Sequence, residues 1–283
     1  MLNKLNKFLI CLWFMLRLKF PLDLLDRDGL CSNPSAVDLL EANPEWIDWN
    51  ILSCNPNGIR LLEKNRRRIH WTLLSSNPGA IDLLEQNIRY VNWLLLSSNP
   101  GAFLLLKEHI DKIDWAFLSE NPSAMPLLLE HVEQINWTLL SRNPSAIELL
   151  KKNPQKISWW GLSSNPGAID LLKKHPEKID WRELSSNPNA MELLSANLEK
   201  IHWGVLSRNP SAMSLLENHP EKIDWVWLSS NPSIFAYDYE TMKEKTSLYK
   251  EELIQMCLHP KRFSKYLYEY NYDLGDDGYF IIV

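Results

Sequence analysis

The chain has 283 residues, of which 45% are hydrophobic and 23% are charged, so it can bury a core and is neither disordered nor collagen-like. Its formal net charge of -5 gives no overall attraction to nucleic acid or anionic lipid, which disfavours broad electrostatic binding to either. The cysteines are scattered without a CxxC pair, which favours reduced thiols over a zinc site or a disulfide framework. They are Cys11, Cys31, Cys54 and Cys257.

The amino-terminal residues contain an apolar run from Phe8 to Leu16, between Lys7 and Arg17. The run, residues 8–16, is too short to span a bilayer. Its basic flank resembles a signal peptide, but no small-residue cleavage site follows. We expect residues 1–23 to form a cap on the first repeat, with an amphipathic helix over the apolar run. A membrane-surface anchor or an uncleaved signal is the alternative.

From residue 24 to residue 232 the sequence repeats every 22 residues without insertion or deletion. The unit reads N-P-x-A-I-x-L-L-x-x-N/H-x-x-x-I-D-W-x-x-L-S-x, and we number its positions from the first asparagine. Leu25 to Cys31 match the second half of a unit, which indicates a degenerate opening half-repeat. The asparagines at position 1 are Asn33, Asn55, Asn77, Asn99, Asn121, Asn143, Asn165, Asn187, Asn209 and Asn231. The tryptophans at position 17 are Trp49, Trp71, Trp93, Trp115, Trp137, Trp159, Trp181, Trp203 and Trp225.

The first half of each unit predicts a helix of about ten residues. In one unit, Asn143 is a favourable N-cap and Pro144 supplies a fixed φ at the first helical position. The helix should end near Asn153, because asparagine tolerates the left-handed conformation and Pro154 cannot continue a helix.

The second half predicts a shorter helix of about one and a half turns. Asp114 is a typical N-cap for it, and Ile113 and Leu118 are spaced as a hydrophobic staple. This helix should end near Ser119, just before the next Asn-Pro.

Helices this short are marginal alone, so each unit must bury its apolar face against its neighbours. The sequence therefore predicts an all-α fold, an α-solenoid of helix-turn-helix repeats wound into a superhelix. At about 9–10 Å per helix pair, the array would form a rod or superhelix of order 90–100 Å with a long concave surface. We interpret the tryptophans as packing residues, the alternative being rings that stack on bases or a ligand.

The repeat fails after Asn231-Pro232, and residues 233–283 predict a C-terminal helical cap. The segment from Leu248 to Met256 has a helical pattern, and His259-Pro260 restarts a helix. A turn over Gly275 to Gly278 precedes the last residues.

The unit is nearly complete from Asn143 to Ser163 and from Asn165 to Ser185. It resembles the uncharacterised repeat proteins of giant DNA viruses of the mimivirus kind, whose chains also close with Tyr-Asp-Tyr and His-Pro segments. Here those segments are Tyr237-Asp238-Tyr239 and His259-Pro260, and the resemblance covers roughly residues 24–270. It implies a viral protein made in an infected host cell, with no catalytic residues to carry over.

No motif of a hydrolase, phosphate-binding loop or metalloprotease is present, so we expect no enzymatic activity and no cofactor. Four histidines replace the asparagine of position 11. Neighbouring histidines of this set would lie about one repeat apart, too far to share a zinc ion, so we expect no metal site. They are His109, His131, His175 and His219.

Four apolar residues occupy positions that are polar in most units. Leu104 and Pro126 stand at position 6, Leu129 at position 9, and Leu94 at position 18. Exposed apolar clusters favour partner binding, and we take these four as candidate protein-binding residues, the alternative being sequence drift. Pro126 should also kink its helix.

One unit is unusually basic, carrying Arg60, Lys64, Arg66, Arg67 and Arg68. Position 13, where Arg67 stands, is acidic in most other units. The cluster is a candidate site for an acidic partner or an anion, and a solvated charge run is the alternative.

The sequence thus predicts a monomeric, non-enzymatic scaffold in the host cell cytoplasm that binds host or viral proteins along its solenoid surface. A membrane-associated or virion structural protein anchored by residues 8–16 is the alternative. Nucleic-acid binding through the basic cluster is the least favoured hypothesis.

Overall fold

The computed structural model describes residues 16–237. Chain contacts define one compact unit, Leu18–Phe235, and a second made of Met1–Arg17 and Ala236–Val283. The predicted cap before residue 16, the apolar run up to Met15 and the predicted helical cap over residues 238–283 lie outside the described residues.

A regular unit contains two α-helices, each preceded by a short 3-10 turn. In the unit that begins at Asn143 these are η11 (Pro144–Ala146), α13 (Ile147–Lys152), η12 (Pro154–Lys156) and α14 (Trp159–Ser163). The Asn143 side chain accepts a hydrogen bond from the Ser145 amide, which confirms the predicted cap. Pro144, however, begins the 3-10 turn and not the α-helix. The second 3-10 turn has no counterpart in the sequence-based prediction.

The first helix ends where the sequence predicts, but by another mechanism. Asn153 follows α13 with φ -130° and ψ 57°, which is not the left-handed conformation. Instead its Nδ2 donates a 2.9 Å hydrogen bond to the carbonyl of Leu149, one of the carbonyls left without a partner at a helix end. Asparagine therefore closes this helix through its side-chain amide.

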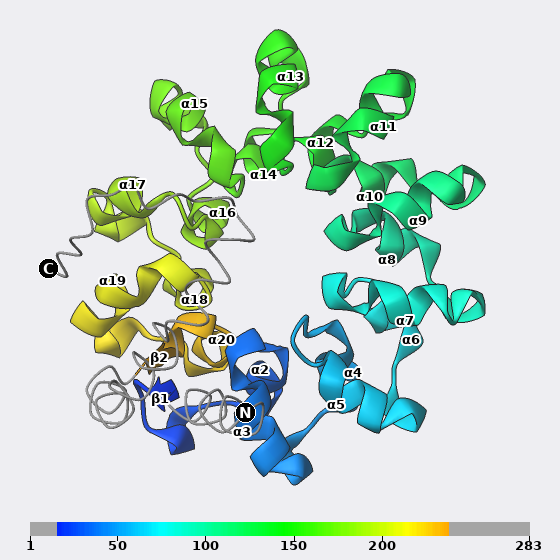
Figure 1. The fold of residues 1–283 in the computed structure, drawn as a ribbon. Helices are drawn as coiled ribbons and strands as arrows, with labels where there is room; N and C mark the ends of the chain where they lie inside the picture. The colour runs from blue at the N-terminus through cyan, green and yellow to red at the C-terminus, as the bar shows by residue number, and fades with distance from the viewer. Residues whose placement is uncertain (1–15, 238–283) are drawn as a thin grey trace, which may run out of the picture. The chain divides into compact units, whose positions relative to one another are not determined.

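The helices alternate between two layers (Figure 1). The inner layer contains α14 together with α2 (Arg27–Ser32), α4 (Trp49–Cys54), α6 (Trp71–Leu74), α8 (Trp93–Ser98), α10 (Trp115–Glu120), α12 (Trp137–Leu140), α16 (Trp181–Ser186), α18 (Trp203–Ser207) and α20 (Trp225–Ser229). The outer layer contains α13 together with α3 (Val37–Ala42), α5 (Ile59–Lys64), α7 (Ile81–Glu85), α9 (Phe103–Glu108), α11 (Met125–Glu130), α15 (Ile169–Lys174), α17 (Met191–Ser195) and α19 (Met213–Asn218).

The 3-10 turns fall at two places in the unit. Those at positions 2 to 4 are η2 (Pro34–Ala36), η5 (Pro78–Ala80), η7 (Pro100–Ala102), η9 (Pro122–Ala124), η11, η13 (Pro166–Ala168), η16 (Pro210–Ala212) and η18 (Pro232–Ile234). Those at positions 12 to 14 are η1 (Leu22–Leu24), η3 (Pro44–Trp46), η4 (Arg66–Arg68), η6 (Ile88–Tyr90), η8 (Ile110–Lys112), η10 (Val132–Gln134), η12, η14 (Pro176–Lys178), η15 (Leu198–Lys200) and η17 (Pro220–Lys222).

The repeat array in Leu18–Phe235 closes on itself. Helix α2 contacts both α4 and α20, and η2 contacts η18, so the first and last units are neighbours. The all-α solenoid predicted from the sequence is confirmed, but the units do not extend as a rod. The spacing of helices gives the distance between successive units, but it does not give the rotation of one unit relative to the next. This rotation, added over all the units, brings the last unit back to the first.

Buried asparagines of the Asn-Pro dipeptides form a hydrogen-bond ladder around this closed array. Asn121 is typical, because its Nδ2 donates to the carbonyl of Asn99 in the preceding unit at 2.8 Å and to that of Ser97, at the end of the unit before it, at 3.0 Å. Asn33 completes the ladder across the closure by donating to the carbonyls of Ser229 at 3.0 Å and Asn231 at 2.9 Å. These amides satisfy carbonyls that would otherwise be buried without a partner.

A second ladder uses the serine of position 21. The hydroxyl of Ser97 donates to the Trp93 carbonyl and accepts from the amide of Asp114 in the next unit at 3.0 Å. Ser229 does the same across the closure, accepting from the Asp26 amide at 2.7 Å. In the opening half-repeat Cys31 replaces the serine, and its Sγ accepts from the Asp48 amide at 3.2 Å.

The closing unit is assembled from both ends of the array. Residues 231–234 supply its positions 1 to 4, and residues 22–32 supply positions 12 to 22. Among the described residues it contains no outer α-helix. The strands β1 (Leu16–Leu18) and β2 (Phe235–Tyr237) pair with each other, and the Lys19 amide donates to the Ile234 carbonyl at 2.9 Å. We call the contact between this composite unit and the unit of Asn33 the seam.

Candidate functional site

Positions 6 and 9 of adjacent units form one continuous surface on the outer helices. Arg60 at position 6 lies 3.1 Å from Asp38 and 2.6 Å from Glu41, at positions 6 and 9 of the preceding unit. Lys173 at position 9 likewise lies 2.7 Å from Glu192, at position 6 of the following unit. Side chains at these positions can therefore contact one another between units.

Three of the four candidate protein-binding residues lie on this surface. Leu104 on α9 and Pro126 on α11 occupy position 6 of adjacent units, and Leu129 on α11 occupies position 9. Leu104 is 71% exposed and Leu129 is 55% exposed, and Pro126 is also exposed. We call these three residues the outer apolar surface.

Leu94 does not belong to the outer apolar surface. It is exposed, but it lies on α8 in the inner layer, whereas the other three residues lie on outer helices (Figure 1). The grouping of Leu94 with them is therefore wrong. Sequence distance along the unit does not reveal that position 18 and positions 6 and 9 belong to different layers.

The kink predicted at Pro126 is absent. Helix α11 begins at Met125, after the separate turn η9, so Pro126 stands in the first turn of its helix. A proline there removes no intrahelical hydrogen bond, since the first amides of a helix have no partner within it. The prediction counted the helix from Pro122.

Further apolar side chains are exposed in the same part of the array and were missed by the sequence analysis. Ile88, Ile110 and Val132 occupy position 12 of three consecutive units, and all are exposed. The sequence contains a signal for these residues, because position 12 is proline in four other units and an apolar aliphatic residue in these three. Those prolines are Pro44, Pro154, Pro176 and Pro220.

The structure divides the basic candidate residues into two groups. Arg60 and Lys64 are in ion pairs with acidic residues of the preceding unit, and Lys64 lies 2.8 Å from Glu41. Arg66, Arg67 and Arg68 form the exposed turn η4, where the Arg68 guanidinium lies 5.4 Å from the centre of the Trp49 ring. The acidic side chains beside Arg60 and Lys64 oppose anion binding by all five residues together.

The tryptophans of position 17 pack against the core, and cations of the next unit lie over several of them. Lys156 lies 4.2 Å from the Trp137 ring centre, and Lys178 lies 4.6 Å from that of Trp159. Such cation–π contacts contribute about 0.5–1 kcal/mol each at exposed sites. The interpretation of these tryptophans as packing residues is in line with this arrangement.

The four histidines of position 11 contact tryptophans of the preceding unit. His109 and His175, for example, lie 4.9 Å from Trp93 and Trp159, measured between ring centres. His131 and His219 make the same kind of contact with Trp115 and Trp203. Over residues 16–237 no three side chains of histidine, cysteine, aspartate or glutamate are grouped in a way that could hold a metal ion.

At the seam the cation and the ring exchange positions. Arg27 stands at position 17, where every other unit has tryptophan, and Trp46 stands at position 14, where several units have the cation. The Arg27 guanidinium lies 5.3 Å from the Trp46 ring centre, so the contact itself is kept.

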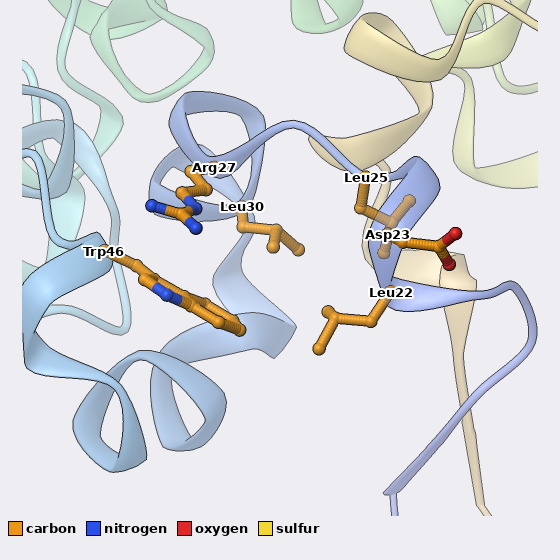
Figure 2. Close-up of a pocket in the computed structure, with 6 residues that line it drawn as sticks. All are labelled: Leu22, Asp23, Leu25, Arg27, Leu30 and Trp46. Atoms are coloured by element: carbon orange, nitrogen blue, oxygen red, sulfur yellow. The ribbon is translucent and has the colours of Figure 1, made fainter.

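A pocket of about 470 Å³ opens beside this exchanged pair (Figure 2). We call it the seam pocket, and it is lined by Leu22, Asp23, Leu25, Arg27, Leu30 and Trp46. Figure 2 shows the Asp23 carboxylate pointing away from Trp46, while the Leu22 side chain extends towards the indole.

Buried titratable groups in the array serve packing. Burial raises the pKa of the Cys31 and Cys54 thiols, which keeps them protonated. The Cys31 thiol also donates towards the Trp46 carbonyl at 3.4 Å, so it is held in the position 21 ladder. Protonated, hydrogen-bonded thiols are poor nucleophiles.

The fold places the chain in a broad class, that of all-α repeat solenoids. No protein-family model, curated protein or solved structure matches it. None of the helices in the described part of the chain is both long and apolar enough to cross a membrane.

Proposed function

We propose that the protein is a non-enzymatic repeat scaffold that binds a host or viral protein through its outer apolar surface. The observation that carries this proposal is the adjacency of Leu104, Pro126 and Leu129 on neighbouring outer helices. A folded chain gains nothing in stability from exposing leucines at positions that are charged in most units. Apolar residues grouped on a surface are typical of contacts with other proteins.

The partner should bury these side chains at the centre of its contact. Burial of a leucine side chain contributes about 1.5–3 kcal/mol, so the two exposed leucines can supply much of a specific affinity. Ile88, Ile110 and Val132 would extend the apolar area towards neighbouring units. The resemblance to giant-virus repeat proteins makes the infected host cell the place to look for the partner.

The test is affinity purification of the tagged full-length chain from infected cells, followed by reconstitution with the recovered partner. A double variant, Leu104→Asp and Leu129→Asp, should lower the affinity about 100-fold or more, because it places two charges in an apolar contact. Isothermal titration calorimetry measures the change.

The matched control is Leu94→Asp, which places the same charge on an inner helix. It should leave the affinity within about twofold of the wild type. Equal loss of binding in the control and the double variant would contradict the proposal, as would full retention of binding by the double variant. Circular dichroism should show both variants folded.

A further inference from the structure

The seam pocket is separate from the outer apolar surface and raises a different question. Its walls include position 17 of the composite unit and position 14 of the next unit, held by Arg27 and Trp46. At the nine other contacts between units, position 17 holds an indole that packs on the core. At the seam, position 17 holds no indole, and the indole present is that of Trp46 at position 14.

Position 11 supplies no ring at the seam. Histidines of position 11 pack on the preceding tryptophan in four units, but here position 11 is Asn43. The Asn43 amide is hydrogen-bonded to the Leu39 carbonyl at 2.9 Å, as the asparagines of position 11 are to the corresponding carbonyl in four other units. The slender Arg27 therefore stands where tryptophan packs in the other units, and position 11 adds no ring beside it.

The remaining walls are suited to an apolar ring. Leu25 and Leu30 are buried core residues, and Leu22 reaches across the opening towards Trp46 (Figure 2). The volume of about 470 Å³ lies within the range of about 300–1,000 Å³ that is common for ligand pockets. It leaves room for a ring together with the chain or substituent that carries it.

Charge favours a ligand without an ionised group. The segment from residue 23 to residue 28 carries Asp23, Asp26 and Asp28 against the single cation Arg27, which disfavours an anion. A cation would meet the Arg27 guanidinium, which already covers the Trp46 ring. An uncharged aromatic ring avoids both penalties and can stack on the guanidinium.

We propose that the seam pocket binds an uncharged planar aromatic ring, in the simplest case an indole, in the space that the chain fills with its own tryptophan at every other contact between units. The ring can belong to a free small molecule or to a tryptophan side chain of a peptide. Binding would consolidate the seam, since the ring would contact residues of the composite unit and Trp46 of the next unit.

The test is fluorine NMR of a fluoroindole titrated with the full-length protein, followed by displacement with indole and with N-acetyltryptophanamide. We expect line broadening that both competitors reverse. Reversal by indole alone would identify a site for free small molecules, whereas stronger competition by N-acetyltryptophanamide would identify a peptide-borne ring. No broadening at any protein concentration would overturn the proposal.

Two variants fill the pocket from opposite walls. Arg27→Trp restores the tryptophan of the repeat, and Leu22→Trp adds a ring from an exposed position, so at least one should fold normally. Both should abolish the broadening. Arg27→Ala leaves the space open and should weaken binding only about two- to fivefold, through loss of the cation. Undiminished binding to a folded filled variant, or complete loss in Arg27→Ala, would overturn the proposal.

Discussion

Each unit depends on a buried asparagine whose side chain makes hydrogen bonds in two directions. Asn121 accepts from the Ser123 amide in its own unit and donates to one carbonyl in each of the two units before it, those of Asn99 and Ser97. No other side chain of similar size offers an acceptor and a double donor in this arrangement. This explains why position 1 is asparagine in every unit, a stronger requirement than N-capping alone.

Replacing Asn121 with alanine should therefore be costly. The change leaves two buried carbonyls and one amide without partners, and we expect the free energy of unfolding to fall by about 2–4 kcal/mol. Urea denaturation followed by circular dichroism measures this change. Asn57→Ala is the matched control, because Asn57 is exposed and makes one side-chain bond to the Pro34 carbonyl. A loss as small as in the control would show that the ladder contributes little.

Glu120 on α10 gives the stability a pH dependence. Burial raises the pKa of its carboxyl, and the Arg142 guanidinium lowers it in partial compensation. Because the folded state favours the protonated form, its contribution to stability is complete below pH 4.5 and is lost as the pH rises through the raised pKa. Glu120→Gln should remove this loss.

The measurement compares urea denaturation of the wild type and Glu120→Gln at about pH 4 and about pH 7. The stability difference between the two proteins should change in favour of the variant at the higher pH. A difference independent of pH would mean that the Glu120 carboxyl is equally solvated in the folded and unfolded chains.

At the scale of the elements, helices α2 and α20 pack closely together where the array closes, and this contact tolerates no added side chain at Gly29. Gly29 on α2 lies so close to α20 that a β-carbon would stand 2.6 Å from Cβ of Ser229 and 2.9 Å from the Val226 carbonyl oxygen. The last helix can approach the first only because this residue has no side chain. Both ladders cross the array at this contact.

Gly29→Ala should thus loosen the contact between α2 and α20, at a cost of about 1–3 kcal/mol for overpacking. Hydrogen exchange of the Asp26 amide, which is bonded to Ser229, should become faster. Gly204→Ala is the control, since its nearest neighbour would be 3.4 Å away and alanine favours the helix. Unchanged exchange at Asp26 would show that the two helices move apart without breaking the closure.

Much of each element could be predicted from the sequence, because the caps and apolar spacing are local. Asp114 caps its helix through the Phe117 amide, and the first helix ends at Asn153, both as predicted. Contacts between units were harder to predict. The sequence of one unit does not show that its position 14 covers the tryptophan of the previous unit. The exchange of Arg27 and Trp46 could therefore be recognised only after the structure showed which positions of adjacent units are in contact.

At the scale of the whole array, closure depends on a rotation that no single unit reveals. Small differences in helix packing angle, added over the units, decide between an open superhelix and a closed array. The candidate sites depend on the same geometry. Leu104, Pro126 and Leu129 share a surface because they lie on outer helices, whereas Leu94 lies in the inner layer.

Deleting one complete unit, residues 121–142, tests this requirement. The shortened chain keeps every local signal but loses the rotation contributed by one unit, so Asn33 should no longer reach Ser229 and Asn231. We expect small-angle scattering to show a more extended particle and hydrogen exchange to show an unprotected seam. Closure of the shortened chain would mean that the angle between units adapts to their number.

The composite unit makes completion of the fold depend on the order of protein synthesis. Residues 22–32 leave the ribosome long before the segment that completes their unit, residues 231–234, is made. Until then Asn33 has no carbonyls to bond, and both edges of the growing array expose core leucines. A chain whose translation stops before residue 234 cannot hide these edges and should be a substrate for chaperones or proteases, so closure acts as a check that translation has passed this segment.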